Sequence, residues 1–460
     1  MVKKFIILIA IAAGLGFLTK SIGLNSQQAL SISVFSASVL GTLFFWDFRL
    51  SFVFLGTSVL LITRTIDLEH LVRYSSLEVI LFLVGMMVLV GLLKESGFFA
   101  LITRLILEIE NITGRKFVII MCVVSALFSA TVDEVTSIIF MVAIVLEICD
   151  RLKVDAVPFV IMSVLATNVG SAATVLGNPI GVLIASKSGL TFEDFIIKSA
   201  PICLICLIVA VIIVMVWYKK PIQQMDENIK KAKAKGLKIE HHPIVFTHDL
   251  KVSVGIFIIT LFFISLHRRL ELLWNLQPNT ILLTMPLISS GIAMIWKWRN
   301  ARKYIEKDVE WWTLLFFLLL FAQAGTLCYT GVTDVLARSL TNVTGTGWTF
   351  LTSLIIWIAA IGSSILDNVV LVAALIPVIQ SFKAMDVVLE PLWWALLLGG
   401  CFGGNITLVG STANIVALGI LEKERKVRIT FMRWFGIGLT VGVVTTVIAW
   451  AMLLFIPFYH

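Results

Sequence analysis

Long apolar runs separated by short polar connections fill the chain almost from end to end. Most of these runs approach or exceed the ~20 apolar residues that a helix needs to cross a bilayer. They cover residues 5–18, 29–46, 51–63, 79–93, 117–149, 158–185, 200–218, 252–266, 280–296, 311–328, 347–382, 392–420 and 434–457. The pattern predicts an all-α polytopic membrane protein with about ten to twelve passes and little mass outside lipid.

The first run, "MVKKFIILIAIAAGLGFLTK", has the basic start and apolar stretch of a signal peptide. No convincing small-x-small cleavage site follows it before the next run, so we expect an uncleaved first helix.

Composition agrees with a membrane protein, and charge suggests its orientation. The 460 residues are 59% hydrophobic and 14% charged, against roughly 45–50% and 25% in soluble domains. The net charge of +8 is concentrated in loops, above all in residues 219–251, which carry eight lysines. The positive-inside rule places this segment in the cytoplasm. We expect a solvated linker rather than a nucleic-acid site, a cytoplasmic N-terminus and location in the inner or plasma membrane.

An internal repeat divides the chain into two halves. Matching residues keep a separation of 233 or 234 positions: Gly97 with Gly331, Asp133 with Asp367, Thr174 with Thr407, and Gly177 with Gly410. Four matches in one order at nearly one offset indicate a duplication. We expect the two halves to insert with opposite orientation, as in many secondary transporters, although parallel repeats would look the same in sequence.

The repeat defines the expected domain organisation. It comprises N-terminal membrane helices (1–70), a first repeat (71–218), a cytoplasmic basic linker (219–251) and a second repeat (252–457).

Each half contains an apolar segment too long for one straight pass. Residues 117–149 and 348–382 span 33 and 35 positions, each with an acid near the middle. A straight helix of that length is about 50 Å long, against a hydrocarbon core of about 30 Å. Folding back at "ATVDEV" (130–135) and "SILDNV" (364–369) gives two re-entrant hairpins with short arms. The alternative is a pair of ordinary spans joined at the surface, where the Asp only caps a helix.

A second, interrupted segment follows each hairpin, at 158–185 and 392–420. "TNVGSAATVLGNP" and "GGCFGGNITLVGSTAN" are rich in Gly, Ser, Thr and Asn, and the first contains Pro. Gly costs ~1 kcal/mol and Pro ~3 kcal/mol within a helix, so these stretches should unwind. Unwound backbone at membrane depth is tolerated only against protein or a water-filled cavity. Close helix packing would explain the glycines, but it does not explain the polar residues beside them.

The hairpin tips and unwound segments together form the predicted ion or substrate site. Its candidate residues are Ser129, Thr131, Asp133, Glu134, Asn168, Thr174, Asn178, Ser363, Asp367, Asn368, Asn405, Thr407, Ser411 and Asn414. A charged carboxylate in mid-membrane costs ~3 kcal/mol, which argues for a functional role. Crowded acids in a low dielectric favour protonation, so the Asp133–Glu134 pair could exchange a proton near neutral pH. A sodium ion would bind at Asp133, Asn168, Asp367 and Asn405.

The motifs "SSILDNVVLVAALIPVI", "GGCFGGNITLVGSTANIVALGI" and "ITFMRWFGIG" closely resemble the ion transporter superfamily, especially its ArsB, NhaD and P-protein branch. The first-half motifs "FSATVDEVTSIIFM" and "NVGSAATVLGNPIGVLIA" are similar to the N-terminal repeat of the same family, so the likeness covers about 78–457. The resemblance implies an inverted-repeat carrier, usually a homodimer, in which a transport domain moves against a scaffold in elevator fashion. Family tips often read Asp-Asn twice, whereas the first tip here is Asp133-Glu134.

The sequence therefore predicts a secondary active ion transporter with no organic cofactor. Sodium/proton antiport is the leading interpretation, and transport of an anion, arsenite or a carboxylate is the alternative. An intramembrane aspartyl protease is disfavoured because neither Asp133 nor Asp367 lies in a Gly-x-Gly-Asp motif. A passive channel is a third class, which currents far above carrier turnover would reveal.

Overall fold

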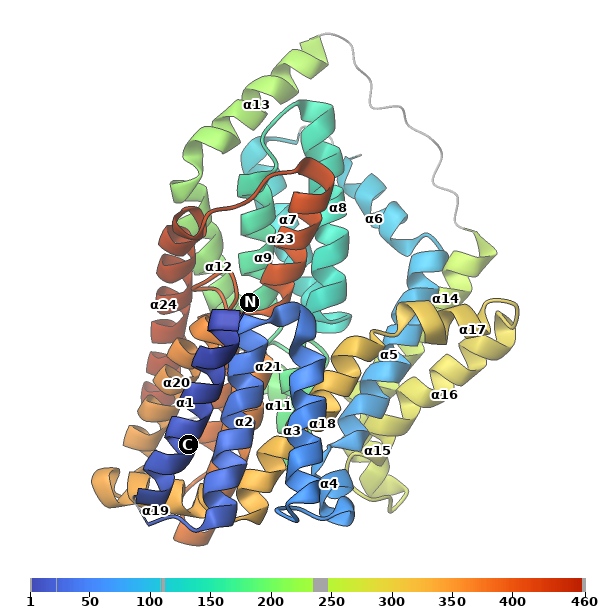
Figure 1. Ribbon diagram of the computed structural model, residues 1–460. Helices are drawn as coiled ribbons and strands as arrows, with labels where there is room; N and C mark the ends of the chain where they lie inside the picture. The colour runs from blue at the N-terminus through green and yellow to red at the C-terminus, as the bar shows by residue number, and fades with distance from the viewer. Residues whose placement is uncertain (1, 22, 108, 110–111, 235–246, 457–460) are drawn as a thin grey trace.

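All the secondary structure formed by the described residues is helical (Figure 1). The structure is a computed structural model that describes the whole chain except residues 1, 22, 108, 110–111, 235–246 and 457–460. Within this part, nine helices are long and apolar enough to cross a membrane, and Val157–Gly170 and Thr280–Trp296 are shorter apolar helices. The prediction of an all-α polytopic membrane protein is confirmed.

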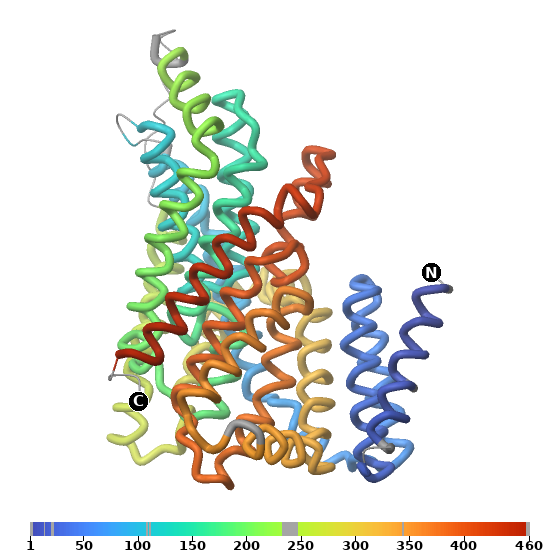
Figure 2. Tube along the Cα trace, turned by 90° about the vertical axis from the view of Figure 1, so that its left-hand side faces the viewer, coloured from blue at the N-terminus to red at the C-terminus, as the bar shows by residue number. Residues whose placement is uncertain are grey.

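The N-terminal helices stand together at one edge of the molecule (Figure 2). They are α1 (Val2–Ser21), α2 (Ser26–Phe44), η1 (Trp46–Phe48), α3 (Arg49–Ile62) and α4 (Leu68–Tyr74). The group is held by α18 (Trp311–Tyr329), where the Gln323 amide donates to the Val53 carbonyl at 2.9 Å and to the Thr57 hydroxyl at 3.1 Å. Since these donors and acceptors are buried, they fix α3 against the second half of the chain.

The two halves contain the same main helices in the same order, with short additional turns in each. The first half has α5 (Leu77–Glu95), α6 (Phe98–Leu107), α7 (Gly114–Thr131), α8 (Glu134–Leu152), α9 (Val157–Gly170), α10 (Pro179–Ser188), α11 (Phe192–Asp194), η2 (Phe195–Ser199) and α12 (Ala200–Trp217). The second has α18, α19 (Val332–Thr344), α20 (Trp348–Ile365), α21 (Asn368–Ser381), η4 (Phe382–Met385), α22 (Glu390–Gly403), α23 (Thr412–Arg425) and α24 (Phe431–Phe455).

The predicted hairpins are α7–α8 and α20–α21. They break between Thr131 and Glu134 and between Ile365 and Asn368, within the two stretches expected from sequence. The arms of the first hairpin have 18 and 19 residues, and those of the second have 18 and 14. The first hairpin is longer than its apolar segment, because α7 begins before residue 117 and α8 ends after residue 149.

The hairpins enter the molecule from opposite ends. In Figure 1, α7 and α8 lie in the half that carries α13 (Lys219–Ala234), and α20 lies toward the half that carries α19. Contacts cross between the repeats: α8 packs against α23, and α10 packs against α21. This crossed packing places both hairpin tips at the middle of the molecule.

Glycines set the same close helix contact in both repeats. A Cβ on Gly170 would lie 2.3 Å from the carbonyl oxygen of Ala126, and one on Gly403 would lie 2.2 Å from that of Ala360. Backbone cannot move aside as a flexible side chain can, so these positions require glycine. The equivalence of the two contacts supports the internal repeat in three dimensions.

The segment expected to be a solvated linker begins with an ordered helix. The apolar side chains of Ile222, Met225 and Ile229 on α13 are buried. Asp226 accepts from the Gly114 N–H at 2.6 Å, and α13 packs against both α7 and α8. Residues 219–234 of the predicted linker are therefore helical, and an apolar stripe with helical spacing docks them on the first hairpin. Residues 235–246 lie outside the described part.

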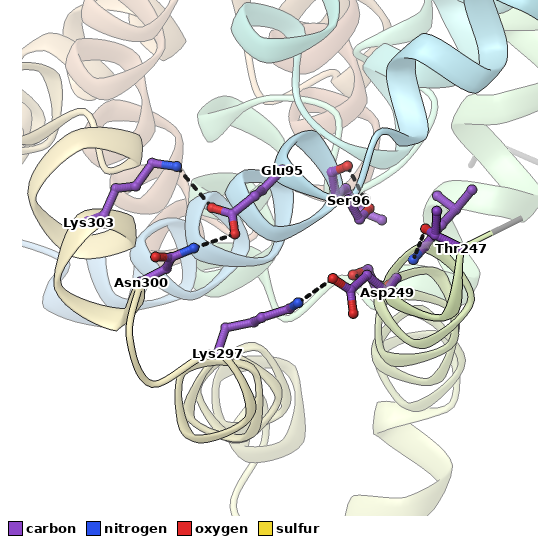
Figure 3. A network of polar contacts seen from close by, with 10 residues as sticks. Glu95, Ser96, Thr247, Asp249, Lys297, Asn300 and Lys303 are labelled. Atoms are coloured by element: carbon purple, nitrogen blue, oxygen red, sulfur yellow. Dashed lines mark hydrogen bonds and ion pairs between the residues drawn. The ribbon is translucent and has the colours of Figure 1, made fainter. Parts of the chain in front are cut away.

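The remaining helices join the two repeats at one end. They are α14 (His248–Ser265), α15 (His267–Leu273), α16 (Thr280–Trp296), α17 (Ala301–Lys303) and η3 (Tyr304–Asp308). In Figure 3 the Glu95 carboxylate at the end of α5 accepts from Lys303 at 2.9 Å and from Asn300 at 2.5 Å. Lys297 donates to Asp249 of α14 at 2.5 Å in the same network. These contacts hold α5, α14 and the connection between α16 and α17 together.

Candidate functional site

Asp133 forms the tip of the first hairpin and caps the helix that follows. Its carboxylate accepts from the Thr136 N–H at 2.8 Å and from the Thr136 hydroxyl at 2.7 Å. The Asp133 backbone has φ 132° and ψ 160°, a conformation that non-glycine residues rarely adopt. Strain of this kind costs of order 1–3 kcal/mol and persists where the surrounding structure enforces it.

Asp367 forms the second tip in an equivalent position. Its carboxylate accepts from the Val369 N–H at 3.0 Å and from the Thr412 hydroxyl at 2.5 Å. Thr412 opens α23, so this bond joins the tip to the broken segment of its own repeat. Both aspartates therefore cap helices, as the simpler alternative held, but Asp367 is buried and Asp133 is half-buried on the wall of an internal cavity.

The broken segments are fastened to the tips by the same bonds in both repeats. The Thr174 hydroxyl donates to the carbonyl of Ala130, and the Thr407 hydroxyl donates to that of Ser364 at 2.5 Å. Ser363 adds a bond to the Gly400 carbonyl at 2.6 Å. Each tip and its unwound segment thus form one unit.

Three buried asparagines hold the two unwound segments to each other. The Asn168 amide donates to the side-chain oxygens of Asn405 and Asn414, both at 2.8 Å, and accepts from Ser411 at 3.2 Å. The Asn414 amide donates to the carbonyls of Gly404 and Thr407, both at 2.8 Å. Because these polar atoms bond to one another, the cluster acts as an internal clamp between the repeats.

Glu134 and Asn368 differ from the clamp because one carboxylate oxygen of Glu134 and both side-chain polar atoms of Asn368 are buried without hydrogen-bond partners among the described residues. Glu134 lies beside Asp367, Asn368 and Ser171, across the junction of the two repeats. The Glu134 and Asn368 side chains lie close to each other at this junction. Glu134 is 1% exposed and Asn368 is fully buried. Such atoms carry a free-energy cost that a bound cation or proton would relieve.

A cavity of about 460 Å³ reaches this junction from the N-terminal helices. Asp133, Glu134 and Thr412 line one side of it, and α5, η3 and α18 supply other walls. Its charged lining residues are Asp47, Arg49, Lys94, Asp133, Glu134, Lys307, Asp308 and Glu310. Acids outnumber bases by five to three, so the cavity as a whole favours a cation.

Arg49 is the buried base of this cavity and was not among the site residues predicted from sequence. Its side chain stacks 4.0 Å from the Trp46 ring, donates to Thr313 at 3.0 Å and lies within electrostatic reach of Asp367. Arg49 is 6% exposed. A charge within the apolar stretch "FFWDFRLSF" was the available signal.

The remaining candidate residues differ in the hydrogen bonds that they form. Asn178 caps α10 through the Gly181 N–H at 2.8 Å, and Ser129 is buried with no hydrogen-bond partner among the described residues. Thr131 instead bonds back to its own helix at the Leu127 carbonyl. Thr136 and Thr412, which hold the two aspartates, were not among the predicted residues, although Thr136 directly follows the first tip motif and Thr412 lies within the second broken-segment motif.

The four residues proposed for sodium belong to three separate sets of contacts. Asn168 and Asn405 bond to each other, while Asp133 and Asp367 bond to Thr136 and Thr412. Over the part of the chain that the structure describes, no group of three or more His, Cys, Asp or Glu side chains is placed to hold a metal ion. A sodium site would thus have to include amide, hydroxyl or carbonyl oxygens.

Two hairpins from opposite ends, two broken segments and a polar centre reached by a cavity define a secondary membrane transporter. The sequence matches the citrate transporter family, CitMHS, over residues 41–399, and the chain belongs to this family.

Known proteins of similar sequence and fold agree with this class. The chain is 33% identical over 377 residues to the uncharacterized transporter MT2759 of Mycobacterium tuberculosis, covering 81% of this chain and 84% of that protein. It is 26% identical over 468 residues to the P protein of Homo sapiens, covering 84% of this chain and 54% of that protein. The YdaH transporter of Alcanivorax borkumensis has the same fold, with a TM-score of 0.53, 16% identity and coverage of 84% and 86%. The expected superfamily is confirmed, and so is the assignment as a transporter rather than an enzyme.

Proposed function

We propose that this protein is a sodium/proton antiporter in which Glu134 is the group that exchanges the proton. The observation that carries the proposal is the buried Glu134–Asn368 junction, where polar atoms of both hairpins lack partners. A proton or a sodium ion, but not both, would satisfy one carboxylate there. Competition for one charge is the simplest means of coupling two cations in opposite directions.

The charge of the cavity supports a cation as the transported species. Five acids and three bases line it, and Lys94 lies 3.9 Å from Asp308, so one base is compensated locally. A cation would be drawn toward the junction by this field.

The movement we propose is of elevator type. Both tips and both unwound segments are bonded into one body through Asn168, Thr174 and Thr407. That body would move against α5, α14, α16 and α18, carrying the junction from one side of the membrane to the other. We also propose a homodimer in the inner or plasma membrane, with the lysine-rich α13 and the N-terminus in the cytoplasm.

Transport by purified protein in liposomes tests the proposal. With an acidic lumen containing a pH-sensitive dye, external sodium should raise the lumenal pH, and potassium or citrate should not. Glu134→Gln should abolish the sodium response because the amide cannot exchange a proton. The matched control is Glu147→Gln on the same helix, whose side chain is exposed and paired with Arg151.

Gel filtration and thermal unfolding of both variants establish that they are folded. A sodium response of normal size in folded Glu134→Gln would rule out the assigned role of this residue.

A second candidate function is cation-coupled transport of a small carboxylate. It is favoured by Arg49, a buried base on the cavity wall, and by the name of the family, citrate transporter. In the same assay, pH changes driven by citrate or a related carboxylate, and unaffected by sodium alone, would select this function.

A further inference from the structure

A groove remote from the transport site lies where α12 meets α13. Its volume is about 770 Å³, and residues of α7, α12 and α13 line it. We propose that this groove binds an anionic phospholipid, with the headgroup on α13 and α7 and the acyl chains along α12.

The floor of the groove is apolar and belongs to a membrane-spanning helix. Ile212, Met215 and Val216 line it, and Ile212 and Val216 are 51% and 73% exposed. They are four residues apart, so they lie on one face of α12. Residues 192–217 form the most apolar of the candidate spans, with a mean hydropathy of 3.1. A face of this kind is suited to contact with lipid chains.

The rim of the groove is basic and begins directly after that span. Lys219 and Lys230 of α13 and Arg115 at the start of α7 line it, and all three are exposed. No ion pair is found for any of them within the described residues. Lys219 follows the last residue of α12, Trp217, by two positions, which places the basic groups at the depth of lipid headgroups.

Two acids, Asp226 and Glu227, also line the groove, and the Asp226 carboxylate already accepts a hydrogen bond within the protein. Asp226 accepts from the Gly114 N–H, so it joins α13 to the base of the first hairpin. The groove is lined by three basic side chains and two acidic ones, Asp226 and Glu227, so it retains an excess of positive charge. A basic helix with a buried apolar side, docked beside a span, has the composition that attracts anionic lipid at the cytoplasmic surface.

The consequence is a link between lipid composition and the first hairpin. A lipid in the groove contacts α12, α13 and Arg115 at once, and α13 is already bonded to both ends of the hairpin through Gly114 and Leu152. Occupancy should therefore stabilise the α7–α8 hairpin against α12, because the ligand binds only the folded arrangement.

Thermal unfolding of the purified full-length protein in detergent tests the proposal independently of transport. Titration with phosphatidylglycerol should raise the Tm of the wild-type protein, and phosphatidylcholine should not. In Arg115→Gln/Lys219→Gln/Lys230→Gln the rise should need about tenfold more phosphatidylglycerol or disappear. The matched control is Lys116→Gln/Lys220→Gln/Lys231→Gln, which removes the same charge from exposed neighbouring positions outside the groove.

The control should respond like wild type. An equal response in both triple variants, or an equal loss, would overturn the proposal, since either result assigns the effect to diffuse surface charge. Stabilisation by soluble glycerol phosphate to the same extent would also overturn it, because the acyl chains would then contribute nothing. If the groove triple variant does not fold, Lys219→Gln against Lys220→Gln gives the same comparison with one charge.

Discussion

At the scale of single residues, the candidate site contains two kinds of buried polar group: those that bond to other protein groups and those without a hydrogen-bond partner among the described residues. The amide and hydroxyl groups of Asn168, Asn405, Asn414 and Ser411 bond to one another or to backbone. Glu134 and Asn368 have similar burial but lack such partners among the described residues. Sequence could not make this distinction, because all six are polar residues in apolar or Gly-rich surroundings.

Arg49 is the buried one of the three basic residues that line the cavity. Arg49→Gln removes the positive charge that interacts with Asp367 and the stacking of the guanidinium on Trp46. We therefore expect a lower Tm and a lower initial rate of transport. Arg49→Lys should recover part of both, since it keeps the charge but loses the planar stacking on Trp46.

The control for Arg49 is Arg338→Gln, an exposed base on α19. Thermal unfolding and initial rates in liposomes measure the two effects separately. Wild-type values for both in Arg49→Gln would show that this base has no part in the site.

At the scale of elements, the close packing of α9 on α7 and of α22 on α20 depends on glycines at the contact. The stretches around Gly170 and Gly403 were predicted to unwind, yet both glycines end regular helices. Unwinding begins just after them. Close helix packing, the alternative weighed from sequence, is thus correct for these two glycines, whereas the polar residues that follow them belong to the breaks.

Adding one methyl group at these contacts tests the packing. Gly170→Ala and Gly403→Ala would place a Cβ 2.3 Å and 2.2 Å from backbone oxygens of the neighbouring helix. The helices would have to separate, which should cost about 1–3 kcal/mol in each variant. Gly255→Ala is the control, because it lies within α14 with nothing near its added Cβ, and it should be neutral or stabilising by about 0.5–1 kcal/mol.

Thermal unfolding of the three variants in detergent gives the order of stability. Equal Tm values for Gly170→Ala and Gly255→Ala would contradict the contact at the first repeat, and the corresponding result for Gly403→Ala would contradict the second.

At the scale of the whole molecule, the duplication and the hairpins could be predicted, whereas the connections between distant segments could not. Length forced the breaks near Asp133 and Asp367, because about 50 Å of helix cannot cross about 30 Å of hydrocarbon. The constant separation of 233 or 234 positions then showed which residues of the two halves are equivalent. The electrostatic interaction of Arg49 with Asp367 relates residues 318 positions apart (367 − 49), and no local sequence pattern predicts such an interaction.

The orientation of the two repeats is the property of the whole molecule that sequence left open. In the fold, the base of the first hairpin lies beside the lysine-rich α13, and α20 begins near α19 toward the other end (Figure 1). If α13 is cytoplasmic, the bases of the two hairpins should face opposite sides of the membrane. Lys116 and Thr349 are exposed residues at these bases and suit chemical labelling.

Single cysteines at these two positions provide the measurement. In a Cys328→Ser background, which leaves only the five buried native cysteines, a membrane-impermeant maleimide is added to intact cells or to inverted vesicles. Lys116→Cys should react in inverted vesicles, and Thr349→Cys should react in intact cells. Labelling after detergent solubilisation is the control for reactivity of both thiols. Reaction of both cysteines from the same side would mean that the repeats insert in parallel, and the two hairpins could not then meet tip to tip from opposite faces of the bilayer.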